Sequence, residues 1–398
     1  MSEYPVIDSD AALRRAVAAL ASGTGPFAVD VERAAGYRYS ARAYLVQIFR
    51  RDAGVFLLDA PALTDFAVLR SALASEEWVL HAASQDLPSL RELGLEPDRI
   101  FDTELAARLL GHDRVGLGAV VASTLGVELA KEYSAANWST RPLPPQWLEY
   151  AALDVLYLVD VRDALERELH EQGKAEAAAQ EFRAVLERPP KPARAEPWRR
   201  LSGIHSLRGR RALAQAREFW QAREALAEQL DMAPGRLIPD RAIVAAIAAG
   251  PTTKAALSQV PGFTGRASRT ELDRWWLALE RGRTAEDLPE ERSSSDTLPP
   301  PRAWAARNPP ADLRLKAARA RIGELARVVH MPTENLLSPD ALRRLAWSPP
   351  DPPDPGAVAA ALTAAGARPW QVAATAPAIA DAFVEALKTE GADGTDPS

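Results

Sequence analysis

The stretch Pro26-Phe27-Ala28-Val29-Asp30-Val31-Glu32 lies close to the start of the sequence and is its most informative part for the fold. Its apolar residues predict a strand. Asp30 and Glu32 lie two positions apart, so a strand places both carboxylates on one face. Two such acids repel each other, and a cation between them would offset the repulsion. Alternatively, the strand lies at an exposed edge of the sheet, where the acids contact solvent or Arg33. The stretch alone leaves both interpretations open.

Further strand and helix patterns follow this stretch. Strands are predicted at 43–49, 55–59 and 78–81, and helices at 103–110 and from 145 to about 186. The closely spaced early strands are typical of a meander. Because alternating strands and helices come after them, we expect a mixed sheet with helices packed on it.

Two more positions are candidates for a shared site with these acids. Tyr150 and Asp154 are four residues apart, which places them on one side of a helix. Asp86 opens a helix directly after the strand at 78–81. Each also has an ordinary structural explanation, because Tyr–Asp pairs are common on amphipathic helices and acids stabilise first helical turns. Their order along the chain is therefore more informative than any one of them.

That order resembles the DEDD exonuclease superfamily in its tyrosine branch: Asp-X-Glu on a strand, Asp at a strand-to-helix junction, then Tyr-X-X-X-Asp on a late helix. The histidine branch would need His where this chain has Glu149. Segments 101–107 and 137–143 are similar to connecting segments of ribonuclease D, and the later helical segments resemble helicase-and-RNase-D C-terminal (HRDC) domains. The resemblance implies an α/β ribonuclease H-like exonuclease domain, a mixed sheet flanked by helices, followed by two all-α HRDC-like domains.

The same resemblance implies roles for individual residues. Two divalent ions, Mg²⁺ or Mn²⁺, are hard cations that prefer oxygen ligands. Their implied ligands are Asp30, Glu32, Asp86 and Asp154. Tyr150 would position the attacking water, because a phenol is a poor base at neutral pH. Six residues are candidate RNA contacts, with packing or plain solvent exposure as the alternative: Tyr44, Gln47, His81, Lys131, Arg141 and Arg266. In the loop before Arg266, Phe263 is a candidate for stacking on a base, whereas Trp275-Trp276 is expected in a core.

Prolines divide the chain into segments. Pro189, Pro190 and Pro192 cannot continue a helix, and a second break spans 288–310. We therefore expect an exonuclease domain at 1–188, a linker at 189–207, a first HRDC-like domain at 208–286, a Pro/Ser-rich linker at 287–310, a second, divergent HRDC-like domain at 311–390 and a disordered tail at 391–398.

The two helical segments resemble each other. Residues 213–243 and 315–345 each contain a helix, a short turn with Met and Pro, an apolar pair and a Pro-Asp start to the next helix. This pattern predicts a duplicated all-α module. Chance similarity between Ala-rich helices is the alternative.

Charge and composition narrow the class of protein. The chain has a net charge of −6, yet residues 198–284 carry 15 Lys and Arg against 8 Asp and Glu. A basic region beside an acidic one suits an enzyme that holds metals with carboxylates and binds phosphates elsewhere, although domains also vary in charge without such a reason. The absence of cysteine excludes disulfides, thiolate zinc sites and a cysteine nucleophile. No apolar run reaches the ~18 residues of a membrane span, and the first residues do not resemble a secretory signal, so we expect a cytoplasmic protein without a membrane partner.

These observations favour a metal-dependent 3′→5′ exoribonuclease. Its expected partner is RNA with a free 3′ end, such as tRNA precursors or other stable RNA, and its oligomeric state stays open. A DNA 3′→5′ exonuclease is one alternative, because the metal ligands do not sense the 2′-OH. A catalytically inactive nucleic-acid-binding protein is another, although such a scaffold has no need for four clustered carboxylates.

Overall fold

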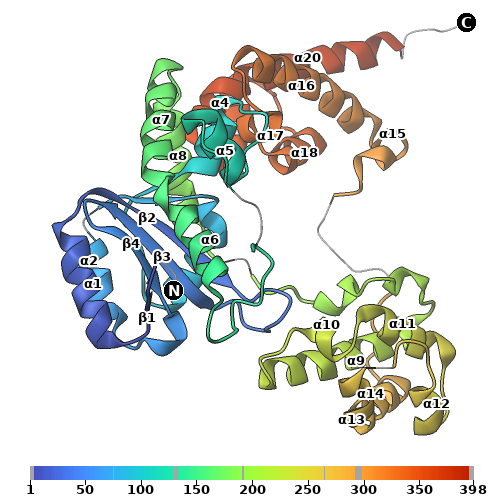
Figure 1. Cartoon of the computed structure of the whole chain (residues 1–398). Coiled ribbons are helices and arrows are strands. Elements are labelled where there is room, and N and C mark those ends of the chain that lie inside the picture. Colours follow the sequence, from blue (N-terminus) through green and yellow to red (C-terminus); the bar gives the residue numbers. More distant parts are fainter. Residues whose placement is uncertain are drawn as a thin grey trace, which may run out of the picture.

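The chain folds into an N-terminal α/β domain and two helical modules, which follow one another along the chain (Figure 1). A computed structural model describes residues 4–74, 76–129, 133–190, 192–263, 265–291 and 298–393. From residue 394 onward the predicted tail lies outside these described ranges. Among the described residues, none of the helices combines the length and the hydrophobicity that crossing a membrane requires.

The α/β domain is built on one mixed sheet with strand order β1-β4-β3-β2-β5-β6. Its strands are β1 (Val6–Ile7), β2 (Thr24–Arg33), β3 (Ala43–Arg51), β4 (Gly54–Leu58), β5 (Trp78–Leu80) and β6 (Ile100–Asp102). The antiparallel meander β2-β3-β4 confirms the predicted pairing. β1, β5 and β6 add parallel pairs, and β1 and β6 were not predicted because two or three residues show no periodicity.

Helices cover both faces of this sheet (Figure 1). They are α1 (Asp10–Ser22), α2 (Phe66–Leu73), α3 (Leu87–Glu92), α4 (Thr103–Leu110), α5 (Leu117–Leu125), α6 (Pro145–Leu156), α7 (Leu158–Glu171) and α8 (Ala175–Leu186). Alternate residues of β2 face opposite ways. Val29 and Val31 pack in the core that includes α1 and α2, whereas Ala28 packs against Val155 of α6. Asp30 and Glu32 therefore lie on the α6 side.

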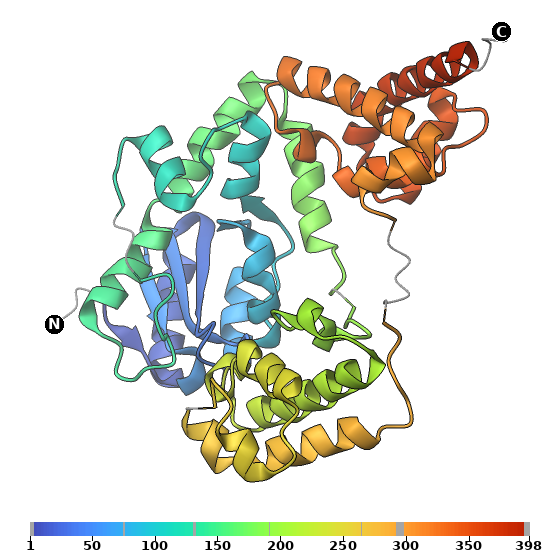
Figure 2. The same cartoon turned by 90° about the vertical axis from the view of Figure 1, so that its right-hand side faces the viewer.

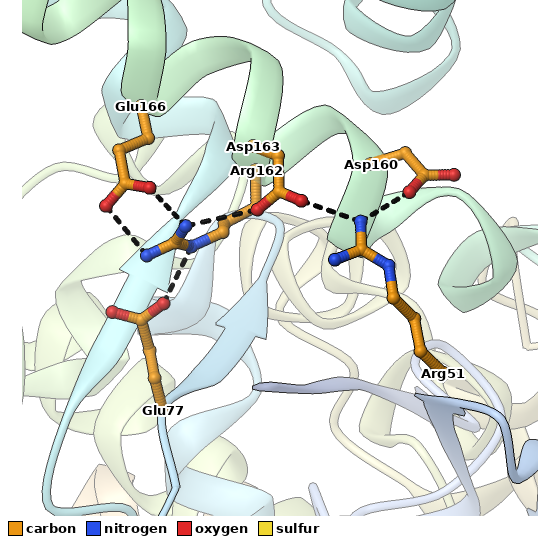
Figure 3. Close-up of polar contacts among 6 residues, drawn as sticks. All are labelled: Arg51, Glu77, Asp160, Arg162, Asp163 and Glu166. Atoms are coloured by element: carbon orange, nitrogen blue, oxygen red, sulfur yellow. Dashed lines mark hydrogen bonds and ion pairs between the residues drawn. The ribbon is translucent and has the colours of Figure 1, made fainter. Parts of the chain in front are cut away.

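The helical stretch predicted from 145 to about 186 is three helices, not one. It breaks at Tyr157 and again at Gly173, whose positive φ of 66° ends α7. Ion pairs fix α7 to the sheet (Figure 3). Arg162 of α7 donates to Glu77, just before β5, at 2.8 Å, and Arg51 of β3 donates to Asp160 at 2.6 Å. Because α7 continues directly from α6, these contacts also hold the end of α6.

Two helical modules follow. The first contains α9 (Arg210–Gln229), α10 (Pro234–Leu237), α11 (Asp240–Ala249), α12 (Lys254–Ser258), α13 (Arg266–Thr270) and α14 (Leu272–Thr284). The second contains α15 (Trp304–Arg307), α16 (Pro309–Val328), α17 (Thr333–Leu336), α18 (Pro339–Trp347), α19 (Pro355–Ala364) and α20 (Pro369–Asp393). Both predicted linkers were too long, because Trp198, Leu201 and Leu207 pack in the first module's core and Trp304 is fully buried in the core that the second module shares with the α/β domain.

Three consecutive helices correspond between the modules. α9, α10 and α11 of the first module start at 210, 234 and 240, and α16, α17 and α18 of the second start 99 residues later, at 309, 333 and 339. The turns after α9 and α16 are equivalent too, because Asp231 and His330 both adopt a left-handed backbone, with φ of 44° and 48°. Residues other than glycine rarely adopt this conformation. The shared geometry supports the predicted duplication.

In both modules this turn contacts the α/β domain, which lies between them in Figure 2. Asp231 accepts hydrogen bonds from the backbone N–H of Ser40 at 2.9 Å and from the hydroxyl of Tyr44 at 3.3 Å. The carbonyl of His330 accepts from Lys174 at 3.2 Å and lies so close to Gly111 that a side chain there would clash. Equivalent turns thus dock on two different places of one domain.

Candidate active site

The predicted acids converge on one cavity of about 500 Å³. Carboxylate oxygens of Asp30, Glu32 and Asp154 lie within 4.8 Å of one another. Asp86 and Tyr150 line the same cavity. Five residues from three separate segments of sequence therefore meet at one place.

Local packing of α6 explains how Tyr150 and Asp154 reach the acids of β2. Leu148, Ala151 and Val155 are buried against the sheet. Alanine on the inner side lets the helix approach closely, while Tyr150 and Asp154, four residues apart, share the neighbouring side. Both line the cavity, and the Tyr150 hydroxyl is hydrogen-bonded to the Asp154 carboxylate.

Asp86 is placed by a tight turn that another acid holds. Ala82 has a left-handed backbone with φ of 61°, which bends the chain sharply after β5. The buried carboxylate of Asp102 accepts the backbone N–H groups of Ala82 at 3.0 Å and Ala83 at 2.9 Å. It also caps α4 by accepting from Glu104 and Leu105. Sequence reasoning missed this positioning role, although Asp102 lies in a segment similar to ribonuclease D.

Burial raises the pKa of every acid in the cluster. Desolvation raises the pKa of Asp30 to about 6 and that of Glu32 to about 10, and Glu32 is also repelled by the three neighbouring carboxylates. Asp86 and Asp154 rise to a pKa of about 8, first through burial and then through repulsion by Asp30. The pKa of the Tyr150 phenol is raised for the same reasons, so the phenol keeps its proton. Such a cluster favours cations that offset its repulsion.

Two arginines also line the cavity, Arg33 and Arg114. Arg33 forms an ion pair with Asp86 at 3.5 Å and donates to the carbonyl of Gln85. In the sequence it appeared only as an alternative partner for the acids, and nothing in the local pattern marked Arg114. Arg33 offsets part of the negative charge, since its guanidinium opposes the rise in pKa of Asp30, Glu32 and Asp86.

The donor set fits divalent metal ions of the hard class. All of the clustered donors are carboxylate oxygens, which Mg²⁺ and Mn²⁺ prefer, and the chain has no thiolate. Asp30, Glu32 and Asp154 are close enough to share one ion, and Asp86 borders the same cavity from the side of α3.

The candidate RNA contacts fall in different environments. Tyr44 is 3% exposed and Gln47 is fully buried, which favours the alternative of packing over contact with RNA. Phe263 is also buried, where its ring packs edge-on against Phe219, so it cannot stack on a base. Trp275 lies in the same core, as predicted. Local sequence could not show this burial, since it depends on neighbours far along the chain.

The remaining candidates differ in whether their polar groups already make hydrogen bonds within the protein. His81 lines the cavity, where a ring nitrogen lies 2.9 Å from the Thr103 hydroxyl and burial lowers its pKa to about 4. Arg141 forms two 2.7 Å hydrogen bonds with Asp59 and also donates to backbone carbonyls, which occupies its guanidinium. Arg266 is exposed on α13, and Lys131 lies outside the described residues.

Comparison with protein-family models agrees with this architecture. Residues 4–170 match a model described as 3′–5′ exonuclease, residues 212–279 match the HRDC domain, and residues 297–383 match a 3′ to 5′ exonuclease C-terminal domain. The mixed sheet, the acidic cavity and these matches define the chain as a 3′–5′ exonuclease.

Relatives identify the family. A Ribonuclease D from Acidiphilium cryptum is 30% identical over 278 residues, 67% of each chain, and that of Escherichia coli is 31% identical over 231 residues, 56% of this chain and 60% of its own. The first five ribonuclease D relatives are matched over 57 to 73% of their lengths. This chain belongs to the ribonuclease D family.

Solved structures share the fold over most of the chain. A protein from Bifidobacterium adolescentis superposes with a TM-score of 0.87 at 35% identity, covering 95% of this chain and 96% of that one. The Escherichia coli RNase D superposes with a TM-score of 0.66 at 24% identity, covering 86% and 90%. Both helical modules therefore belong to a known three-part arrangement.

Proposed function

We propose that this chain is a two-metal 3′→5′ exoribonuclease that trims tRNA precursors or other stable RNA. The observation that carries the proposal is the convergence of Asp30, Glu32, Asp86, Asp154 and Tyr150 on one cavity. A scaffold that only binds RNA has no need for buried carboxylates with raised pKa values, because they destabilise the fold.

The four carboxylates would hold two divalent ions, Mg²⁺ or Mn²⁺. When bound, such ions activate water and offset charge on the phosphoryl and leaving oxygens. Side chains of the protein position the attacking water and add positive charge near the phosphate. Asp154 accepts the hydrogen bond that orients the Tyr150 phenol, and the phenol, which keeps its proton, positions the attacking water. Arg33 and Arg114 contribute positive charge beside the phosphate.

RNA is favoured over DNA as the substrate by the relatives. The curated proteins matched over most of this chain are named Ribonuclease D, and the Escherichia coli structure is described as an exoribonuclease involved in structured RNA processing. The exposed Arg266 and the net positive charge of residues 198–284 provide a second surface for phosphates.

A gel-resolved digestion tests the proposal. A 5′-labelled single-stranded RNA and its DNA counterpart are incubated with Mg²⁺ or Mn²⁺, beside an EDTA control and an Asp30→Asn/Asp154→Asn variant. The expected result is a ladder that shortens from the 3′ end of RNA and is absent from both controls. Faster digestion of DNA than of RNA would show that the chain is a DNA exonuclease instead. Intact RNA in every lane, with binding retained in a shift assay, would overturn it.

A further inference from the structure

A buried amide lies next to the acidic cluster, on the strand that pairs with β2. Gln47 of β3 is fully buried, yet among the residues that the structure describes neither its side-chain nitrogen nor its oxygen has a hydrogen-bond partner. Buried side-chain amides are nearly always paired, because an unpaired one loses its bonds to water without replacement. The unpaired amide therefore needs an explanation.

Strand register shows what this amide can reach. Gln47 is paired with Asp30 across the antiparallel β2–β3 ladder. Residues paired in this way point to the same face, with Cβ atoms ~4.5–5.5 Å apart. Gln47 and Asp30 thus share the face that α6 covers, and Gln47 does not itself line the cavity.

The neighbours of Gln47 within the sheet on that face, apart from Asp30, are apolar. Leu45 and Phe49 stand two positions away on β3, and Leu57 is paired with Gln47 from β4. Leu45 and Leu57 pack in the cluster under α6. Of the two residues paired directly with Gln47, only Asp30 has a group that can accept an amide proton.

We infer that Gln47 is a positioning residue for the metal site, whose side-chain N–H donates to the Asp30 carboxylate when Asp30 turns toward a bound cation. The inference rests on the proposed function. A ligand carboxylate has two oxygens, and a donor to the second one fixes the direction of the first. One oxygen of Asp30 lies within 4.8 Å of oxygens of Glu32 and Asp154, and the amide of its strand partner Gln47 is the buried donor with no other hydrogen bond to make among the described residues.

Calorimetric titration of the full chain with Mn²⁺, without RNA, tests this assignment. The variants are Gln47→Met and Gln47→Leu, which remove the amide and keep the bulk. Leu45→Met, buried on the same strand and face, is the matched control. We expect about 10-fold weaker Mn²⁺ binding in both Gln47 variants and wild-type affinity in the control. In EDTA, the Tm of the Gln47 variants should equal or exceed that of the wild type, because no polar group is left unpaired.

Several results would overturn the inference. Unchanged Mn²⁺ affinity in Gln47→Met, or equal weakening in Leu45→Met, would show that packing alone matters at this position. A second test, by nuclear magnetic resonance, uses the wild type, so its result cannot come from a substitution that destabilises the fold. Its Gln47 side-chain N–H signals should shift on saturation with Mg²⁺, and static signals would also refute the role. If the wild type binds no Mn²⁺ at all, the proposed function fails, whereas normal wild-type binding with no effect at Gln47 removes only this inference.

Discussion

The carboxylate of Asp102 accepts the backbone N–H of Ala82 at 3.0 Å, and Ala82 is the residue whose left-handed backbone turns the chain toward Asp86. Asp102 also accepts from the next backbone N–H and from two amides at the start of α4. One buried acid therefore joins the end of β5 to the end of β6 and fixes the direction from which Asp86 enters the cavity.

Replacing Asp102 by Ala should lower the free energy of unfolding by about 2–4 kcal/mol, because several buried N–H groups lose a charged acceptor. Activity should fall as well, since Asp86 loses its support. Urea unfolding followed by circular dichroism measures the first effect and RNA digestion the second. Asp98→Ala, an exposed acid just before β6, is the control and should change neither. Wild-type stability in Asp102→Ala would contradict this account of the turn.

The metal-free protein should lose stability as the pH rises. Glu32, Asp86 and Asp154 have folded pKa values of about 10, 8 and 8, well above those of ordinary carboxyl groups. The folded state therefore holds more protons than the unfolded state above about pH 4, and the contribution of these groups to stability declines as the pH rises through their folded pKa values.

Glu32→Gln isolates this effect. In EDTA at pH 8 it should be more stable than the wild type by at least about 1 kcal/mol, and the difference should shrink toward pH 5. Urea unfolding at four pH values measures it. Added Mg²⁺ should stabilise the wild type more at pH 8 than at pH 6, because protons then compete less for the carboxylates. A constant difference across the pH range would rule out burial of the charge as the cause.

Tyr150→Phe should lower kcat by about 10²-fold, because the hydroxyl that positions the water is lost. Binding of Mn²⁺ should change little, since the four carboxylates remain. Single-turnover digestion and calorimetric titration measure the two effects. Tyr157→Phe, at the junction of α6 and α7, is a matched control that should retain activity. Full activity in Tyr150→Phe would remove the tyrosine from the mechanism.

Docking of the first helical module should depend on Arg236. Its guanidinium donates to the carbonyl of Gly36 at 2.8 Å and lies 4.1 Å from the ring centre of Tyr37. Arg236→Ala should weaken docking by about 1 kcal/mol at this exposed position. Because the chain has no cysteine, a pair of dyes can be attached to cysteines introduced at the exposed Ser71 and Arg269. In Arg236→Ala the distribution of energy-transfer efficiencies between the two dyes should broaden. Arg241→Ala, exposed on α11, should leave the signal unchanged, and no change in Arg236→Ala would show that other contacts suffice.

Much of the fold could be predicted from local pattern. The meander and the helix at 103–110 have clear periodicity, and their bounds agree with the structure within a few residues. The predicted linkers failed for a physical reason: Trp198 and Trp304 lie among prolines, so their surroundings resemble a linker, yet each ring is buried in a core formed by distant helices.

The acids of the candidate site could be proposed from sequence because their order along the chain resembles a known superfamily. What surrounds them could not. Arg141 is bound to Asp59, 82 residues earlier, and Tyr44 to Asp231, 187 residues later. Pairs so far apart in the sequence produce no periodic pattern. An arginine that forms an ion pair with a distant acid therefore cannot be told, from sequence alone, from one that can bind phosphate.

The docking turns at Asp231 and His330 have a consequence for how firmly the enzyme holds its parts together. The Asp231 turn of the first module docks through polar contacts, so the same surfaces on separate molecules would associate weakly. On one chain, however, the local concentration of a tethered module is of the order of millimolar. The weak polar contacts of the Asp231 turn are then mostly formed. The second module differs, because it adds to its turn a hydrophobic core that it shares with the α/β domain. The first module should therefore leave the catalytic domain more readily than the second.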